Sequence, residues 1–326
     1  MTVQLLVPVL LLGLLLPAVV GPRVLRSAAP VLSRFPRVAI WLLTGGVVFW
    51  VLAALSIGPL LAWLVTGPQV LPTGATEVCS RCLAASDPFG LDRVDTAIPV
   101  VLLLTVPLAA AVAQAARVVG AMAHRRRETR RTAARWRGAG RSVDLHGYHV
   151  QLVDDWHPFA MALPSRSGGV IVSTAAVEVL AERELEAVLA HESAHLRQGH
   201  HALAAAVSTL TTGLRWVPLF AAVEAALGHY LEIAADDAAR RAVGTPALAS
   251  ALLTLGQYGR PREHQEDSGG VLHALGPDRI RHLVQPASGT RGLTAAVASA
   301  CCLTALAVLA VMVHVPYLVA VATGCF

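Results

Sequence analysis

Residues 182–196 read Glu-Arg-Glu-Leu-Glu-Ala-Val-Leu-Ala-His-Glu-Ser-Ala-His-Leu, and this stretch decides how the rest of the chain is interpreted. Most of its residues are strong helix formers, and its apolar residues recur at helical spacing. The pattern predicts an α-helix. Residues four apart on a helix share a face, so His191 and His195 can point their imidazoles at one common point.

The pattern His191-Glu192-x-x-His195 is typical of catalytic zinc sites. Two imidazole nitrogens can bind one zinc ion, while Glu192 stands beside the metal without binding it. A carboxylate in that place can take the proton of a water molecule that attacks a carbonyl. The alternative is a surface helix with two solvated histidines.

A catalytic zinc ion needs a third protein ligand and an open fourth position. The best candidate is Glu232, in a second helix-favouring segment downstream. Asp236 follows it by four residues, on the same helix face, and could accept the outer N–H of a zinc-binding histidine. The alternative for this pair is ordinary acidity on a helix surface.

These two segments together resemble the gluzincin membrane metallopeptidases of families M48 and M56. The resemblance is closest to M56, which contains the β-lactam sensor-transducers of the BlaR/MecR type. It implies one Zn²⁺ per chain, bound by His191, His195 and Glu232. It also implies that Glu192 is the catalytic residue and that Asp236 orients a zinc-binding histidine. Arg279 resembles an arginine that follows the site in these families.

The same resemblance implies a protein or peptide substrate in the cytoplasm or near the membrane, with a transcriptional repressor as one candidate. The sensor-transducers carry a penicillin-binding domain after their last membrane span, whereas this chain ends there. Direct β-lactam sensing is therefore not expected.

The composition is that of a membrane protein. The chain has 326 residues, of which 55% are hydrophobic and 14% charged, with a mean hydropathy of +0.59. Such a chain is too apolar for an ordinary soluble protein. Four uncharged runs are long enough to span a bilayer, namely Val3 to Val20, Val38 to Val65, Thr96 to Ala116 and Leu293 to Val321.

Arginines set the expected orientation. Four of them follow the first run, and a dense basic segment begins at His124 and continues through Arg141. Positive charge stays inside, so both termini are expected outside the bacterial cell membrane and the peptidase domain in the cytoplasm. The basic segment is interpreted as an anchor at anionic lipid, and no nucleic-acid binding is expected, because no stacking platform accompanies it.

The expected fold is a mainly α membrane protein with four transmembrane helices and a cytoplasmic α+β zincin-like domain. Its predicted divisions are 1–123, 124–290 and 291–326. Short strands are predicted before the motif helix, at Tyr148 to Asp154, Pro158 to Leu163 and Val170 to Ser173. Phe159 to Ala162 is the candidate edge strand that would pair with an extended substrate. Ser173 or Thr174 is the expected cap of the next helix.

Three cysteines are expected on the outer side, where the surroundings are oxidising: Cys79, Cys82 and Cys325. The pair Cys79-x-x-Cys82 could be half a zinc site, a redox pair or a structural disulfide. A disulfide among the three is the preferred interpretation, and no bond at all is the alternative.

The main functional hypothesis is a membrane-embedded zinc metalloendopeptidase. One alternative is a non-catalytic zinc-containing receptor or scaffold, whose metal site would be closed by a fourth ligand such as His200 or Asp237. Another is an M48-like protease for membrane protein quality control. The apolar segment 202–227 could be a buried helix pair or a hairpin that enters the membrane.

Overall fold

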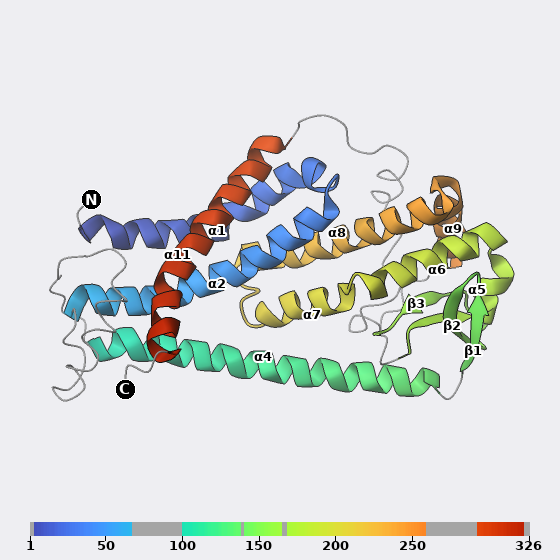
Figure 1. The fold of residues 1–326 in the computed structure, drawn as a ribbon, viewed down its shortest axis with the longest axis horizontal. Coiled ribbons are helices and arrows are strands. Elements are labelled where there is room, and N and C mark those ends of the chain that lie inside the picture. The colour runs from blue at the N-terminus through green and yellow to red at the C-terminus, as the bar shows by residue number, and fades with distance from the viewer. Residues whose placement is uncertain (1–2, 67–99, 138–139, 165–167, 259–291, 323–326) are drawn as a thin grey trace.

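A computed structural model describes residues 3–66, 100–137, 140–164, 168–258 and 292–322. The predictions for Cys79, Cys82, Cys325 and Arg279 lie outside these residues. The molecule is elongated, with the two termini near one end and a compact α+β domain at the other (Figure 1). Four long helices extend from the terminal end, namely α1 (Val3–Leu32), α2 (Pro36–Thr66), α4 (Val100–Arg137) and α11 (Leu293–Ala322).

Two of the described helical segments are long and apolar enough to cross a membrane, Leu11–Leu32 and Pro36–Ile57. A shorter apolar stretch covers Leu293–Leu309. The other two predicted spans therefore stay predictions. Helix α4 has 38 residues and runs without a break from the third predicted span through the basic segment, so the predicted division at residue 123 falls inside a helix.

A four-stranded sheet lies in the compact domain, in the order β1-β2-β4-β3. Strand β2 (Tyr148–Val153) pairs antiparallel with β1 and parallel with β4 (Val170–Ser173). Strand β3 (Ala160–Ala162) pairs antiparallel with β4 and forms one edge, as predicted for this segment. Strand β1 (Gly140–Leu145) was not predicted, because its sequence continues the basic run.

The turn between β1 and β2 explains why a hairpin forms there. It has two residues, His146 and Gly147, and both have positive φ, 49° and 81°. This is the geometry of the two-residue turns that match the twist of antiparallel strands. A non-glycine residue at positive φ is uncommon, and histidine is one of the residue types that tolerate it.

The motif helix α6 (Glu182–Arg197) follows a short helix, α5 (Thr174–Val179), whose N-cap is Ser173, as predicted. The Ser173 hydroxyl accepts a hydrogen bond from the Ala176 N–H at 3.1 Å. One face of α6 packs on the sheet through Leu185, Val188 and Leu189. Its other sides contact α8 and α9 (Thr245–Tyr258), so α6 lies at the centre of the domain.

Helices α7 (His200–Leu210) and α8 (Pro218–Val243) form a hairpin that leaves the domain and lies beside the long helices (Figure 1). Pro218 occupies the first turn of α8, where its missing N–H costs nothing. Fully buried Phe220 packs edge-on against Trp50 of α2, with ring centroids 5.1 Å apart. Segment 202–227 is therefore a helix pair packed against α1, α2 and α4.

Candidate metal centre

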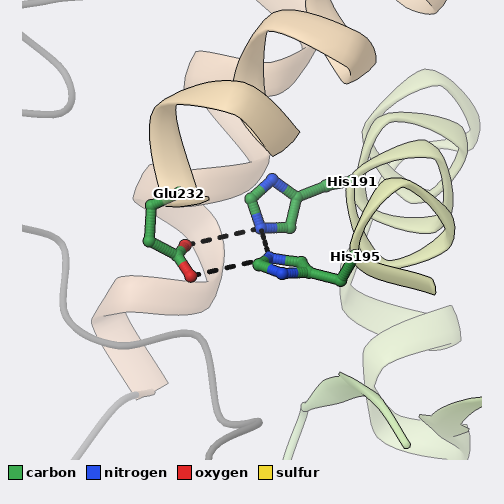
Figure 2. A group of neighbouring side chains, drawn as sticks. All are labelled: His191, His195 and Glu232. Atoms are coloured by element: carbon green, nitrogen blue, oxygen red, sulfur yellow. Dashed lines mark hydrogen bonds and ion pairs between the residues drawn. The ribbon is translucent and has the colours of Figure 1, made fainter. Parts of the chain in front are cut away.

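Helices α6 and α8 bring three side chains together, although their residues lie about forty positions apart in the chain. His191 and His195 project from α6 toward Glu232 on α8 (Figure 2). The two histidine Nε2 atoms are 3.1 Å apart. Glu232 Oε2 lies 3.6 Å from His191 Nε2, and its Oε1 lies 3.5 Å from His195 Nε2. One ligand atom from each residue can be chosen so that all three lie within 4.8 Å of one another.

These separations fit one zinc ion. Ligand atoms about 2.0 to 2.1 Å from a tetrahedral zinc ion are roughly 3.3 Å from one another. The observed values of 3.1, 3.5 and 3.6 Å lie on both sides of that distance, with the last two measured from the two different oxygens of the Glu232 carboxylate. Two imidazole nitrogens and one carboxylate are also a usual donor set for catalytic zinc. The residues present therefore fit the metal that the sequence predicts.

Asp236 lies one helical turn beyond Glu232 and reaches the far side of His191. Its Oδ1 is 3.0 Å from His191 Nδ1, and both side chains are almost completely buried, with 2% and 3% exposed. Because Nδ1 faces the carboxylate, Nε2 is the nitrogen that faces Glu232. Glu192 is buried beside His191, with 3% of the residue exposed.

His200, which the sequence offered only as a possible fourth zinc ligand, lies against the outer nitrogen of His195. Its Nδ1 lies 3.0 Å from His195 Nδ1, and the residue is 3% exposed. The chain reaches this place because Gly199, between α6 and α7, has a left-handed conformation with φ 65°. Glycine adopts this conformation without the cost that a side chain adds. The available signal was the dipeptide Gly199-His200, a turn residue followed by a second imidazole.

Burial and neighbouring charges separate the pKa values of the three rings. Burial lowers the pKa of His191, but Asp236 and Glu232 outweigh burial and raise the value to about 10. Burial, together with the adjacent His191, lowers the pKa of His195 to about 3. Burial lowers the pKa of His200 to about 4, although Glu232 opposes the change. The carboxylates of Glu232 and Asp236 therefore favour the protonated form of the His191 ring, whereas burial favours the neutral form of the other two rings.

A buried and a half-buried imidazole, a converging carboxylate and a carboxylate behind one ring define a metallopeptidase-like centre. A comparison with protein families supports this class, because residues 122–287, about half of the chain, match the model of Peptidase family M48. The chain belongs to this family. Its members are zinc-dependent peptidases, so the comparison supports a metallopeptidase function.

No curated protein and no solved structure matched the chain. The family match is to M48, so the closer resemblance to M56 and to the BlaR/MecR type is not supported by it. The matched residues include α6 and α8, which carry the three converging side chains.

Proposed function

We propose that this protein is a membrane-anchored zinc metalloendopeptidase that hydrolyses peptide bonds of a cytoplasmic or membrane-proximal protein. One observation carries the proposal: His191, His195 and Glu232 present ligand atoms at separations that suit a single zinc ion. The family match to M48 supports the peptidase activity. The two long apolar helical segments support membrane anchoring.

The chemistry follows from the residues around this point. Zinc bound by the three side chains supplies a Lewis acid that lowers the pKa of water and polarises the scissile carbonyl. Glu192, buried beside His191, accepts the proton of the attacking water and later donates it to the leaving amine. Burial of this carboxylate keeps bulk water away from it, which strengthens its interaction with the proton.

Two positioning residues fix the tautomers of the histidine ligands. When both Nε2 atoms bind metal, both Nδ1 atoms carry hydrogen. His191 then donates to Asp236, and His195 donates to His200 Nδ1, across the 3.0 Å contacts. His200 must in turn carry its own hydrogen on Nε2. His191 is thus oriented by a carboxylate and His195 by a neutral imidazole. The two zinc-binding rings therefore differ in basicity.

The edge strand β3 is the proposed support for the substrate. It packs against α6, the helix that carries the two histidines, and among the described strands it pairs with a partner on one side only. An extended peptide can add to such an edge through main-chain hydrogen bonds. Residues on both sides of the scissile bond would then be held in line, which favours an endopeptidase.

The narrower substrate prediction, a transcriptional repressor, is supported by the resemblance of the motif segments to the sensor-transducers. The prediction of a cytoplasmic peptidase domain is supported by the arginine distribution in the sequence.

The substitution Glu192→Gln tests the activity. We expect the variant to retain zinc, because none of the three ligands changes, and to lose about 10²- to 10⁴-fold in kcat, because the proton acceptor is removed. Zinc content and cleavage of a casein substrate, measured on the same detergent-purified preparations, check both parts. Unchanged cleavage in the variant would refute the peptidase assignment.

A non-catalytic scaffold would need a closed zinc site, and both candidate fourth ligands are engaged elsewhere. His200 Nδ1 faces the outer nitrogen of His195, and Asp237 Oδ1 lies 3.0 Å from Arg240 Nη2. These contacts favour an open fourth position and therefore the enzyme. A quality-control protease would be recognised by broad cleavage of unfolded membrane proteins in cells that carry the intact protein but not the Glu192→Gln variant.

A further inference from the structure

The turn between α7 and α8, residues 211–217, is a polar cluster at the end of an otherwise apolar hairpin. Glu224 of α8 accepts a hydrogen bond from the Thr211 hydroxyl and forms an ion pair with Arg215, whose Nη2 lies 2.9 Å from Oε2. Arg215 is nevertheless 62% exposed. The next residue, Trp216, is 80% exposed. We call residues 211–217 the hairpin tip.

Helix α4 adds two more cations to the hairpin tip. Arg125 Nη2 donates to the Ser208 hydroxyl at 2.5 Å, and Arg215 Nη2 lies 3.4 Å from the same oxygen. Arg117 lies over Gly213, where an added Cβ would stand 3.1 Å from Arg117 Cδ. Three guanidinium groups thus lie at or beside the hairpin tip, and one of them, that of Arg215, is paired with Glu224.

Within the described residues, neither Arg117 nor Arg125 forms an ion pair. Like charges repel unless an anion lies among them, and Glu224 neutralises only one of the three positive charges. The hairpin tip therefore has an excess of positive charge next to an exposed indole. This combination is typical of the water–membrane interface, where Trp lies at headgroup level and arginine binds anionic lipid.

The contacts of the hairpin tip and of the first turn of α8 show where such an interface would cross the long helices. Gly213 meets Arg117 on α4, Phe220 meets Trp50 on α2, and Leu219 lies against Gly21 on α1. From these levels toward the terminal end, each helix is free of charged residues.

The uncharged lengths beyond these contacts suit a bilayer. The segments Trp50 to Thr66 and Val100 to Ala116 have about 17 residues each, roughly 26 Å of helix. This is close to the minimum needed to span a hydrocarbon core of about 30 Å.

A membrane level closer to the peptidase domain is the alternative. Helices α1 and α2 extend well past the hairpin tip in that direction, to Leu32 and Pro36. A bilayer that covered these parts of the two helices would also enclose Arg117 and Arg125 of α4, which packs beside α2. Each arginine at the centre of a bilayer costs about 2.5 to 3.5 kcal/mol. The arginines therefore place the boundary at the hairpin tip.

We propose that the hairpin tip and α4 form a binding site for the headgroup of an anionic phospholipid, in the leaflet that faces the peptidase domain. Arg117, Arg125 and Arg215 hold the phosphate, and Trp216 lies among the lipid carbonyl groups. The hairpin then touches the membrane without crossing it. This inference rests on the membrane anchoring in the proposed function, although not on the peptidase chemistry.

The proposal also gives the distance of the metal centre from the membrane surface. Helix α8 begins at the hairpin tip and reaches Glu232 about 15 residues later, roughly 22 Å along its axis. A cleavable peptide bond therefore lies about 20 Å from the membrane surface. Substrates would be cut in a segment outside the bilayer and not within a membrane span.

A binding experiment tests the headgroup site. The detergent-purified full chain is titrated with dioctanoyl phosphatidylglycerol, with dioctanoyl phosphatidylcholine and with inorganic phosphate, while bound lipid is measured by native mass spectrometry. We expect phosphatidylglycerol to bind most tightly, and Arg117→Gln to weaken it about fivefold, the value of one arginine at an anionic surface. The matched control is Arg127→Gln, an exposed arginine on the same helix that forms no hydrogen bond or ion pair with the described residues.

Equal binding of both lipids, or equal weakening by the two variants, would overturn the site. Equal affinity for inorganic phosphate would show an anion site without lipid specificity and would also overturn it.

A second measurement tests the membrane level. The protein is reconstituted into vesicles with lipids brominated either near the headgroup or near the chain end, and the fluorescence of Trp216 is taken as the difference between wild type and Trp216→Phe. Stronger quenching by the shallow bromine is expected. No quenching, or stronger quenching by the deep bromine, would place the hairpin tip elsewhere and reject the proposal.

The two proposals fail separately. If alkaline carbonate released the protein from membranes, this would contradict the membrane anchoring and therefore the lipid site. The Glu192→Gln experiment would still test the peptidase activity. Lipid binding can be measured whether or not that variant loses activity.

Discussion

Helix α8 holds two glutamates about two turns apart in opposite situations. Glu224, near the hairpin tip, is paired with Arg215 and Thr211, with 19% of its side chain exposed. Glu232, two turns further along, is equally shielded at 21% but faces the imidazoles of His191 and His195. A guanidinium is always charged and neutralises its carboxylate permanently, whereas an imidazole can give up its proton and bind metal. The neighbouring residue, more than burial, therefore decides which glutamate is available to bind a metal ion.

The largest expected effect comes from exchanging each glutamate for glutamine. We expect Glu232→Gln to lower zinc affinity by more than about a hundredfold, since removing a ligand should cost more than the 10- to 100-fold typical of its supporting residues. The matched variant Glu224→Gln should leave zinc affinity within about twofold. Competition with a chromophoric chelator measures both. Similar affinities in the two variants would contradict the proposed difference between the two glutamates.

The next effect concerns the carboxylate behind His191. Asp236→Asn keeps the shape of the side chain but removes its charge, so the His191 ring loses the anion that favours a proton on Nδ1. We expect zinc affinity to fall by about 10- to 100-fold. Isothermal titration of the metal-free protein measures it. Wild-type affinity in this variant would show that the 3.0 Å contact does not support the site.

His200 gives a smaller and more diagnostic effect. His200→Phe fills the space but cannot accept the His195 Nδ1–H, so zinc should bind about tenfold more weakly. His200→Gln offers a carbonyl oxygen in place of the ring nitrogen and should restore most of the loss. A purely structural role for His200 would instead predict that both variants change thermal stability and that neither changes zinc affinity selectively.

The smallest expected effect is on the stability of the hairpin. Glu224→Gln should lower the free energy of unfolding by about 0.5 to 1 kcal/mol, because the lost ion pair is largely exposed on the arginine side. Denaturant titration in detergent measures this change. A loss several times larger would mean that the pair is shielded from water, which would place the hairpin tip inside the hydrocarbon.

Local sequence rules were sufficient for the elements around the site. Helix α6 follows from its helix formers and apolar spacing, the N-cap at Ser173 follows from its hydroxyl, and β3 was expected at an edge. Strand β1 was missed because charge patterning in the basic run concealed it, whereas the hairpin forms through the positive φ of His146 and Gly147. The presence of a histidine in the sequence does not predict a turn with this backbone conformation.

The hairpin of α7 and α8 shows a different limit of prediction from sequence. Composition could not distinguish a buried helix pair from a membrane hairpin for residues 202–227, because both environments favour apolar residues. The contact of Phe220 with Trp50 and the contact of Arg117 with Gly213 depend on how helices α2, α4 and α8 and the turn before α8 lie beside each other. No periodicity within one segment contains that information.

The sequence by itself determined which residues could bind a metal, because the spacing of His191 and His195 on one helix turn is a local property. It also ranked Glu232 and Asp236 as partners through their chemistry. Only the tertiary structure decided that these groups meet, by packing α8 against α6, and that His200 returns to His195 across the turn at Gly199. The physical reason is that helix spacing follows from covalent geometry, whereas the convergence of two helices follows from the burial of apolar faces distributed along the whole chain.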